Sequence, residues 1–226
     1  MKISFLGHGC ILLETHDKRL LVDPFITPNE QAKDIVVEDL HPDYILLTHA
    51  HQDHLADAER IALRTGAKII STFEVMNFFE QKGCSGHGMN IGGKHHFDFG
   101  MLKMVNAVHT SSFPDGTYGG HPVGFVIWNS EACIYLAGDT GLLMDMQLIP
   151  MTCPAVDMAV LPVGDYFTMG YEDAIVAAGF VQCKRVMGVH FNTFDIIKID
   201  SEKAIKSFRE ADIELILPTI GQTIDL

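Results

Sequence analysis

The sequence predicts an α/β protein whose architecture is a four-layer αββα sandwich. Residues 2–23 and residues 97–139 both read as β-meanders, and each meander is followed by alternating strands and helices. The two halves supply strands for two sheets and helices for their outer faces, so packing the sheets face to face is the economical arrangement. The halves share this pattern without a long exact repeat. No linker divides the 226 residues, so we expect one domain over residues 1–226.

The first half opens with three expected strands, over residues 2–6, 10–14 and 19–23, joined by turns at residues 7–9 and 15–18. The apolar run at residues 43–47 predicts a buried strand. Helices are expected over residues 55–64 and 74–82, because Gly66 and Gly83 provide stop signals, and a strand over residues 68–71 separates the two helices.

The second half begins after residues 83–94, whose glycine-rich, polar sequence predicts a loop. Strands are expected over residues 97–109, 123–129 and 133–139, which form the second meander. The last third alternates, with strands over residues 158–163, 185–190 and 214–217 and helices over residues 171–182 and 201–211. This alternation repeats the strand and helix pattern of the first half.

The bulk composition excludes several classes of protein. Lys and Arg number 16 and Asp and Glu number 29, and the net charge of −13 disfavours a surface for nucleic acid or anionic lipid. No apolar stretch approaches the roughly 20 residues of a membrane helix, and the N-terminus lacks the apolar core of a secretion signal. The dispersed cysteines form no C-x-x-C pair, which argues against disulfides and thiolate metal sites. We therefore expect a soluble, cytoplasmic protein that binds neither nucleic acid nor membrane.

Residues 48–54, with the sequence Thr-His-Ala-His-Gln-Asp-His, hold four potential metal ligands directly after the apolar run. His49, His51, Asp53 and His54 offer nitrogen and oxygen donors that suit zinc, manganese or iron. One ion cannot easily use four neighbours that point to different sides. The spacing therefore suggests two adjacent ions, one on the first two histidines and the other on Asp53 and His54. The alternative interpretation is a polar loop that is rich in histidine by chance.

Three further candidate ligands each follow an apolar, strand-like run. His109 comes after residues 104–108, Asp139 after residues 134–138 and His190 after residues 185–189. Ligands at the same end of several buried strands converge on one edge of the sheets, where loops form the usual ligand cleft of α/β proteins. A single histidine after a strand is more often a turn residue, but together with residues 48–54 the three indicate a dinuclear metal site.

The loop at residues 48–54, followed in order by His109, Asp139 and His190, resembles the metal-binding motifs of the metallo-β-lactamase superfamily. Residues 5–10, 23–25, 89–93 and 189–194 are similar to a group of uncharacterised metal-dependent hydrolases akin to ascorbate-6-phosphate lactonase. The resemblance spans nearly the whole chain and implies the αββα fold. It also implies the following ligands: His49, His51 and His109 on one ion, Asp53, His54 and His190 on the other, and Asp139 bridging both.

These observations predict a metal-dependent hydrolase with a dinuclear centre and a bridging hydroxide. Two divalent cations lower the pKa of bound water from about 15.7 toward neutrality and polarise the oxygen under attack. Zinc and manganese are the expected ions, and the donor set also accepts iron or nickel. Asp53 is expected to be catalytic as well, by orienting the nucleophile or accepting a proton. The expected partner is a small-molecule substrate, namely a lactone, a phosphoester or a related ester or amide.

Two residues are expected to contact substrate. These are His8 and Asn192, with a turn role for His8 and a loop-backbone role for Asn192 as the alternatives. Residues 113–120 and 165–170 are expected to supply pocket walls.

Carboxylates near the ligands are candidates for a supporting role. Asp23 and Asp43 are expected to accept hydrogen bonds from ligand histidines, and for Asp43 a turn role is the alternative. His87, His95 and His96 fall in or beside an expected loop, and we interpret them as surface histidines.

Other functions fit the sequence less well. The alternative from another class is a non-catalytic, metal-dependent ligand-binding or sensor protein. Flavodiiron oxidoreductases carry a glutamate at the position of His51, and the common dizinc β-lactamases carry a cysteine at that of Asp139, so neither activity is expected. The sequence leaves the oligomeric state open, with a homo-oligomer as one option.

Overall fold

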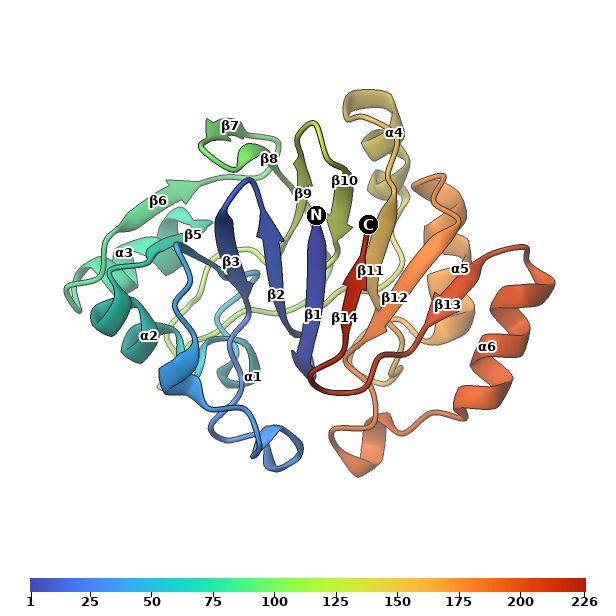
Figure 1. The fold of residues 1–226 in the computed structure, drawn as a ribbon, viewed down its shortest axis with the longest axis horizontal. Coiled ribbons are helices and arrows are strands. Elements are labelled where there is room, and N and C mark those ends of the chain that lie inside the picture. The colour runs from blue at the N-terminus through green and yellow to red at the C-terminus, as the bar shows by residue number, and fades with distance from the viewer.

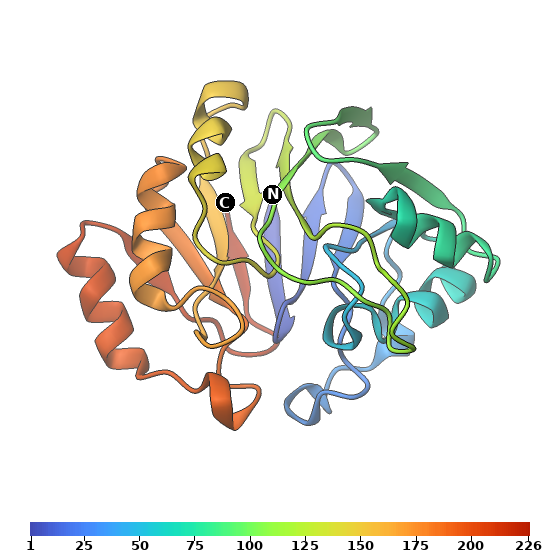
Figure 2. The same ribbon diagram turned by 180° about the vertical axis from the view of Figure 1, so that it is seen from behind.

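The computed structural model describes residues 1–226 and contains two seven-stranded mixed sheets. In Figure 1, α2 (Ala58–Thr65) and α3 (Phe73–Glu80) lie outside one sheet, and α5 (Tyr171–Phe180) and α6 (Ser201–Glu210) lie outside the other. Figure 2 shows the same arrangement from behind, with the two helix pairs at opposite sides of the molecule. The αββα sandwich expected from the sequence is therefore confirmed.

The first sheet combines an antiparallel meander with a parallel extension. Its strand order is β14-β1-β2-β3-β4-β5-β6. The pairs from β14 to β3 are antiparallel, and the pairs from β3 to β6 are parallel. The strands are β1 (Lys2–Gly7), β2 (Cys10–Thr15), β3 (Lys18–Val22), β4 (Tyr44–Leu46), β5 (Lys68–Thr72), β6 (Gly86–Met89) and β14 (Thr223–Asp225).

The second sheet has the same plan. Its strand order is β13-β12-β11-β10-β9-β8-β7, with antiparallel pairs from β7 to β10 and parallel pairs from β10 to β13. The strands are β7 (Lys94–Phe97), β8 (Gly100–Asn106), β9 (Val123–Trp128), β10 (Cys133–Leu136), β11 (Met158–Pro162), β12 (Arg185–Val189) and β13 (Glu214–Ile216).

Short helical segments complete the chain. They are the helices α1 (Gln52–Leu55) and α4 (Ile149–Thr152), and the 3₁₀ turns η1 (Glu30–Ala32), η2 (Val37–Asp39), η3 (Met144–Leu148) and η4 (Asp195–Ile197). None of the helices combines the length and the apolar character that crossing a membrane requires.

The packing between the layers explains why the central strands are apolar on both faces. In β4, Leu46 belongs to the buried cluster between the two sheets, whereas Ile45 belongs to the cluster beneath α2 and α3. A third cluster fills the space beneath α5 and α6. Alternate residues of a strand point to opposite faces, so a strand covered on both sides is apolar at every position. This is why residues 44–47 form an unbroken apolar run.

The structure differs from the expected elements at short, weakly apolar segments. Residues 83–94 were expected to be a loop, but they contain β6, which has the sequence Gly-His-Gly-Met and pairs with β5. A Cβ at Gly86 would lie 2.0 Å from the Ile69 carbonyl oxygen, so the approach requires glycine. The expected strand over residues 97–109 is shorter, because β8 covers only Gly100–Asn106 and pairs with β7, which was not expected; β14 was not expected either. Backbone pairing with a neighbouring strand stabilises these segments. The hydrophobic pattern within one segment does not reveal such pairing, because the partner strand lies elsewhere in the sequence.

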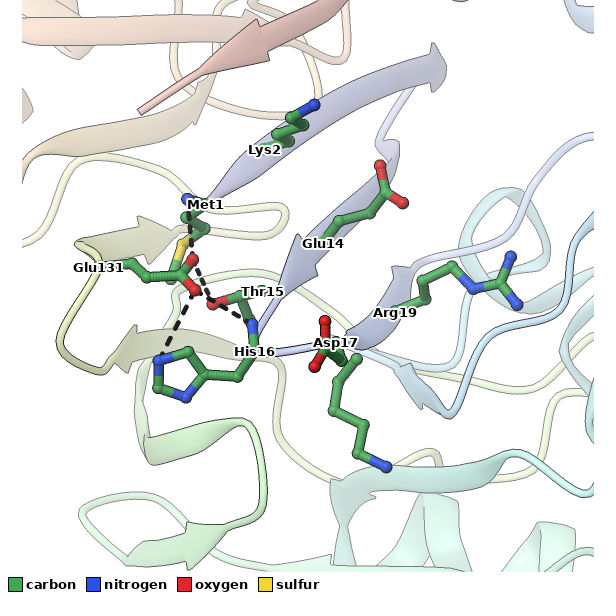
Figure 3. Close-up of a pocket in the computed structure, with 9 residues that line it drawn as sticks. Met1, Lys2, Glu14, Thr15, His16, Asp17, Arg19 and Glu131 are labelled. Carbon is green, nitrogen blue, oxygen red and sulfur yellow. Dashed lines mark hydrogen bonds and ion pairs between the residues drawn. The ribbon is translucent and has the colours of Figure 1, made fainter.

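A polar contact joins the two sheets at the end of the sandwich where the N-terminus lies (Figure 3). The Met1 amino group lies 2.8 Å from a Glu131 carboxylate oxygen, in the turn between β9 and β10. The same carboxylate accepts hydrogen bonds from the Thr15 hydroxyl at 3.0 Å and from the His16 amide at 3.3 Å. The Glu131 contact lies at the Met1 end of β1, whereas the candidate site described below lies at the Gly7 end.

Candidate metal centre

The histidine-rich loop leaves β4 and turns directly into α1. His49 is buried just beyond the strand, and α1 begins at Gln52, so Asp53 and His54 lie in a helical turn while His49 and His51 lie in extended chain. Successive residues of a helical turn point in different directions. His49 and His51 share one group of converging donor atoms and Asp53 and His54 share another, while His49 and His54 also meet in a third group.

The other three candidate ligands reach the same place from the second sheet. His109 follows β8, Asp139 follows β10 and His190 follows β12. Their donor atoms and those of the loop form overlapping groups in which all atoms lie within 4.8 Å of one another. These groups are His49, His51 and His109; His49, His54 and Asp139; and His8, Asp53, His54 and His190.

Asp139 lies at the centre of the cluster. Its Oδ2 atom is 3.0 Å from His190 Nε2, 3.3 Å from His54 Nε2 and 3.7 Å from His109 Nε2. Burial would raise the pKa of this carboxyl, but His190 and His54 hold it well below its usual range. One ionised oxygen therefore faces donors from both halves of the cluster.

The hydrogen bonds around the rings test whether the cluster fits metal ions. His54 Nδ1 donates to Asp23 Oδ2 at 2.9 Å, which leaves its buried Nε2 aimed into the cluster without a hydrogen-bond partner. Two neighbouring ring nitrogens, His49 Nε2 and His51 Nδ1, lie 3.0 Å apart. Neutral imidazoles fixed by an outer hydrogen bond, together with carboxylates, are the ordinary donors to zinc and similar ions. The residues fit divalent cations.

Burial also prepares several of the histidines as ligands. It lowers the pKa of His49 well below the usual value, and it lowers the pKa of His51 and His109 to a smaller degree. For His54 burial acts in the same sense, but Asp139 and Asp23 outweigh it and raise the pKa of that ring. Only a neutral imidazole nitrogen can bind a metal ion, so the lowered pKa values favour binding.

The two supporting carboxylates expected from the sequence have different outcomes. Asp23 is buried and accepts hydrogen bonds from the Thr48 amide at 2.8 Å, the Thr48 hydroxyl at 2.7 Å and His54 Nδ1. Its predicted role is confirmed. For Asp43 that role is wrong, because its carboxylate accepts from the Arg19 amide and pairs with Lys18 on the surface. The expected turn contact with its own backbone is not what the structure shows either, since Asp43 bonds the neighbouring strand β3 at Arg19.

His8 lies beside the cluster in the turn between β1 and β2. Its side chain is buried, its Nε2 lies 3.1 Å from Asp53 Oδ2, and its Nδ1 lies 3.0 Å from the Thr193 hydroxyl. Burial and the neighbouring His190 lower the pKa of His8 to about 4. A neutral ring donates from one nitrogen and accepts at the other, so His8 donates to the Asp53 carboxylate and accepts from Thr193.

Asn192 does not line the cleft. Its side-chain oxygen accepts a hydrogen bond from the Ile199 amide at 2.9 Å, and its carbonyl accepts one from the Gln31 side chain. These contacts correspond to the loop-backbone alternative.

A cleft of about 320 Å³ opens over the cluster. Its walls include Phe167, from the expected wall segment 165–170, but no residue of segment 113–120. The sequence did not identify Thr110 and Phe194 as cleft residues. The one signal for them is that each follows a candidate ligand histidine within a few residues. The cleft is lined by His51, Asp53, His109, Thr110, Asp139, Phe167, His190 and Phe194.

His87 and His95 are brought together by β6 and β7 rather than by a loop, with ring centroids 4.4 Å apart. They join no group of three metal-ligating side chains. Their interpretation as histidines outside the metal centre agrees with this geometry.

Comparison with known proteins agrees with the fold and the cluster. The model of the beta-lactamase superfamily domain matches residues 2–190. The UPF0173 metal-dependent hydrolases of Christiangramia forsetii and Flavobacterium johnsoniae are 55% and 50% identical to the chain, each over 100% of both proteins. Among solved structures, Igni18, a metallo hydrolase from Ignicoccus hospitalis, superposes with a TM-score of 0.89 at 32% identity, over 100% of this chain and 97% of the other.

A more distant structure shares the fold alone. The isothiocyanate hydrolase from Delia radicum gut bacteria has a TM-score of 0.80 at 20% identity, over 100% of this chain and 99% of that one. The matched family model, the curated relatives and the His/Asp cluster point the same way: the chain belongs to the metallo-β-lactamase superfamily and is one of its metal-dependent hydrolases.

Proposed function

We propose that the protein holds two divalent metal ions and hydrolyses a small lactone, phosphoester or related ester or amide. The observation that carries this proposal is the position of Asp139 Oδ2, within 3.0 to 3.7 Å of ring nitrogens on His190, His54 and His109. Two cations a few ångströms apart need an anionic ligand between them to offset their repulsion, and a single carboxylate facing both sets of donors supplies it. The expected similarity to ascorbate-6-phosphate lactonase stays a prediction.

The two donor sets support the assignment of ligands. His49, His51 and His109 form one compact group, while Asp53, His54 and His190 belong to another, and Asp139 contacts both. We propose that these are the ligands of the two ions. Zinc and manganese suit the nitrogen and oxygen donors best, and iron and nickel also bind such sites.

When bound, the ions would lower the pKa of a coordinated water toward neutrality and polarise the substrate oxygen under attack. The chain itself supplies proton handling through Asp53. His8 and His54 hold the pKa of this carboxyl below its usual range although burial acts in the opposite sense, and its side chain lines the cleft. An ionised carboxylate beside the substrate can orient the attacking water and accept its proton at an Oδ atom.

His8 is best placed to support Asp53. Both of its ring nitrogens are engaged, one by Asp53 and one by Thr193, and the ring is buried. This geometry supports a role in fixing the Asp53 carboxylate rather than contact with substrate. For Asn192, the hydrogen bond to the Ile199 amide supports a role in shaping the loop after His190.

Five unpaired cysteines also agree with the cytoplasmic location proposed from the sequence.

Metal analysis combined with a substrate screen tests the proposal. Protein loaded with zinc or manganese should contain about two equivalents, and His49→Ala should lose about one of them together with hydrolysis of lactones, phosphodiesters or esters. His121→Ala, which changes an exposed histidine outside the cluster, is the matched control. Two bound equivalents without turnover on any of these substrates would favour the sensor alternative, and a single equivalent would refute the dinuclear centre.

A further inference from the structure

Two phenylalanines stand exposed in the wall of the cleft. Apart from the metal-ligand candidates, the cleft is lined by Thr110, Phe167 and Phe194. Phe167 is 52% exposed and Phe194 is 42% exposed. A large apolar side chain left in contact with water forgoes the stabilisation that burial provides. Two such side chains facing one small cavity indicate that the cavity receives an apolar group.

The chain holds Phe167 in place through strained backbone. Asp165 and Tyr166 both adopt left-handed conformations, with φ of 60° and 61°. Consecutive non-glycine residues rarely adopt this conformation, because the Cβ atom crowds the carbonyl oxygen, and such strain collects at functional sites. Hydrogen bonds keep the loop closed, from the Phe167 amide to the Asp165 carbonyl at 2.7 Å and from the Met169 amide to the Thr140 carbonyl at 2.9 Å. Since Thr140 follows Asp139, the loop is tied to the metal centre.

Phe194 is held just as firmly from the other side. Its ring packs edge-on against His8, with centroids 5.4 Å apart, and lies tilted against Phe25, with centroids 6.4 Å apart. The neighbouring Thr193 is hydrogen-bonded to His8. The backbone of the Phe167 loop and the ring of Phe194 therefore both contact residues that lie next to the candidate metal ligands.

The cleft also lacks a protein group that would pair with a negative charge on the substrate. No lysine or arginine is among its lining residues. The net charge of the chain is −13, which adds no general attraction for anions. A negatively charged group of the substrate lying against Phe167 or Phe194 would lose its hydration without gaining a protein partner.

We propose that Phe167 and Phe194 select substrates in which an uncharged aromatic group adjoins the bond that is hydrolysed. This inference rests on the proposed hydrolytic function and deepens it. Aromatic rings pack against one another in edge-to-face or offset arrangements, so two exposed rings favour a flat, uncharged partner over an alkyl or negatively charged one. The metal centre would act on the adjoining ester, lactone or amide group, while the two rings position the remainder.

Binding of a fluorinated probe tests the selection without requiring turnover. The ¹⁹F resonance of 4-fluorobenzyl alcohol should broaden saturably with metal-loaded protein. Phe167→Ala and Phe194→Ala should each weaken this binding roughly tenfold. The matched control is Phe73→Ala, because Phe73 is 64% exposed and does not line the cleft. Benzyl alcohol should displace the probe, and 4-(hydroxymethyl)benzenesulfonate, with its distal charge, should do so roughly tenfold less well.

A kinetic measurement complements the binding test. In the native protein kcat/KM should be higher for benzyl acetate than for ethyl acetate, and both phenylalanine substitutions should reduce that ratio. Absence of probe binding, an equal effect of Phe73→Ala, equal displacement by the sulfonate, or an unchanged ratio would overturn the inference. If no lactone, phosphoester, ester or amide is hydrolysed but probe binding still depends on Phe167 and Phe194, the hydrolytic function fails while recognition of the aromatic group stands.

Discussion

Replacing Asp23 by asparagine should weaken metal binding more than the same replacement of a surface aspartate that contacts no candidate ligand. Asp23 accepts three hydrogen bonds, from the Thr48 amide at 2.8 Å, the Thr48 hydroxyl at 2.7 Å and His54 Nδ1 at 2.9 Å. Asparagine keeps the shape but replaces one acceptor oxygen by an NH₂ group. In one orientation the NH₂ group faces the Thr48 amide, and in the other it faces His54 Nδ1. In the first orientation the buried Thr48 amide is left without an acceptor, and in the second the His54 ring must change its tautomer.

The size of the effect follows from these contacts. An unsatisfied buried donor costs about 1–3 kcal/mol, so the metal-free Asp23→Asn protein should melt roughly 2–12 °C lower than the native protein. When the amide nitrogen faces His54, the ring must accept at Nδ1 and carry its proton on Nε2, the atom aimed into the cluster. Loss of such an outer partner typically lowers metal affinity 10- to 100-fold, which is about 1.4–2.8 kcal/mol.

Competition against a fluorescent zinc indicator would measure the affinity, and thermal unfolding with chelator would measure the stability. Asp43→Asn is the matched control, because that carboxylate lies on the surface, where it contacts Lys18 and the Arg19 amide. It should change stability by no more than about 1 kcal/mol and leave metal affinity unchanged. Native affinity in the Asp23 variant, or an equal loss in the Asp43 variant, would refute the reasoning.

Three further predictions concern the cluster and the core. The metal-free protein should lose stability as the pH falls from about 7 toward 4, because burial lowers the pKa of His49 below the unfolded value of about 6.5 and the unfolded state takes up the proton first. The raised pKa of His54 acts in the opposite sense, but the lowered pKa values of His8, His51 and His109 act in the same sense as that of His49, so a melting temperature that rises on acidification would contradict this prediction. Gly9→Ala should lower metal affinity, since a Cβ there would lie 3.1 Å from the His54 ring; Gly141→Ala, with no atom within 4 Å, should not, and equal zinc titrations would disprove the difference. Phe125→Ala, between the sheets, should lower the free energy of unfolding by about 3–5 kcal/mol in urea titrations, and a loss below 1 kcal/mol would be inconsistent with its complete burial.

The candidate ligands could be found from the sequence because His49, His109, Asp139 and His190 each lie just beyond the end of a buried strand, and the other three share the loop of His49. An apolar run that stops at a histidine or aspartate, as at His109 and Asp139, marks both the strand and its exit at one sheet edge. The same rule fails for strands stabilised mainly by backbone pairing. β6 contains two glycines and β14 is short, so neither shows a hydrophobic pattern.

The walls of the cleft were harder to predict than its floor. Segment 165–170 was expected to line it, but the position of Phe167 depends on left-handed backbone at Asp165 and Tyr166. Neither residue type signals that conformation strongly. Similarly, Asp23 and Asp43 look alike in sequence, each beside an apolar strand, and only the packing of Thr48 and His54 distinguishes them.

The candidate ligands are divided between the two sheets. The loop after β4 belongs to one sheet, whereas His109, Asp139 and His190 follow strands of the other. Bound ions would therefore link the two sheets through shared ligands, in addition to the apolar packing between the sheets. Sliding one sheet against the other would pull donors apart on both ions at once. Loading with metal should then make the unfolding of the two sheets more cooperative, so that both unfold in a single transition.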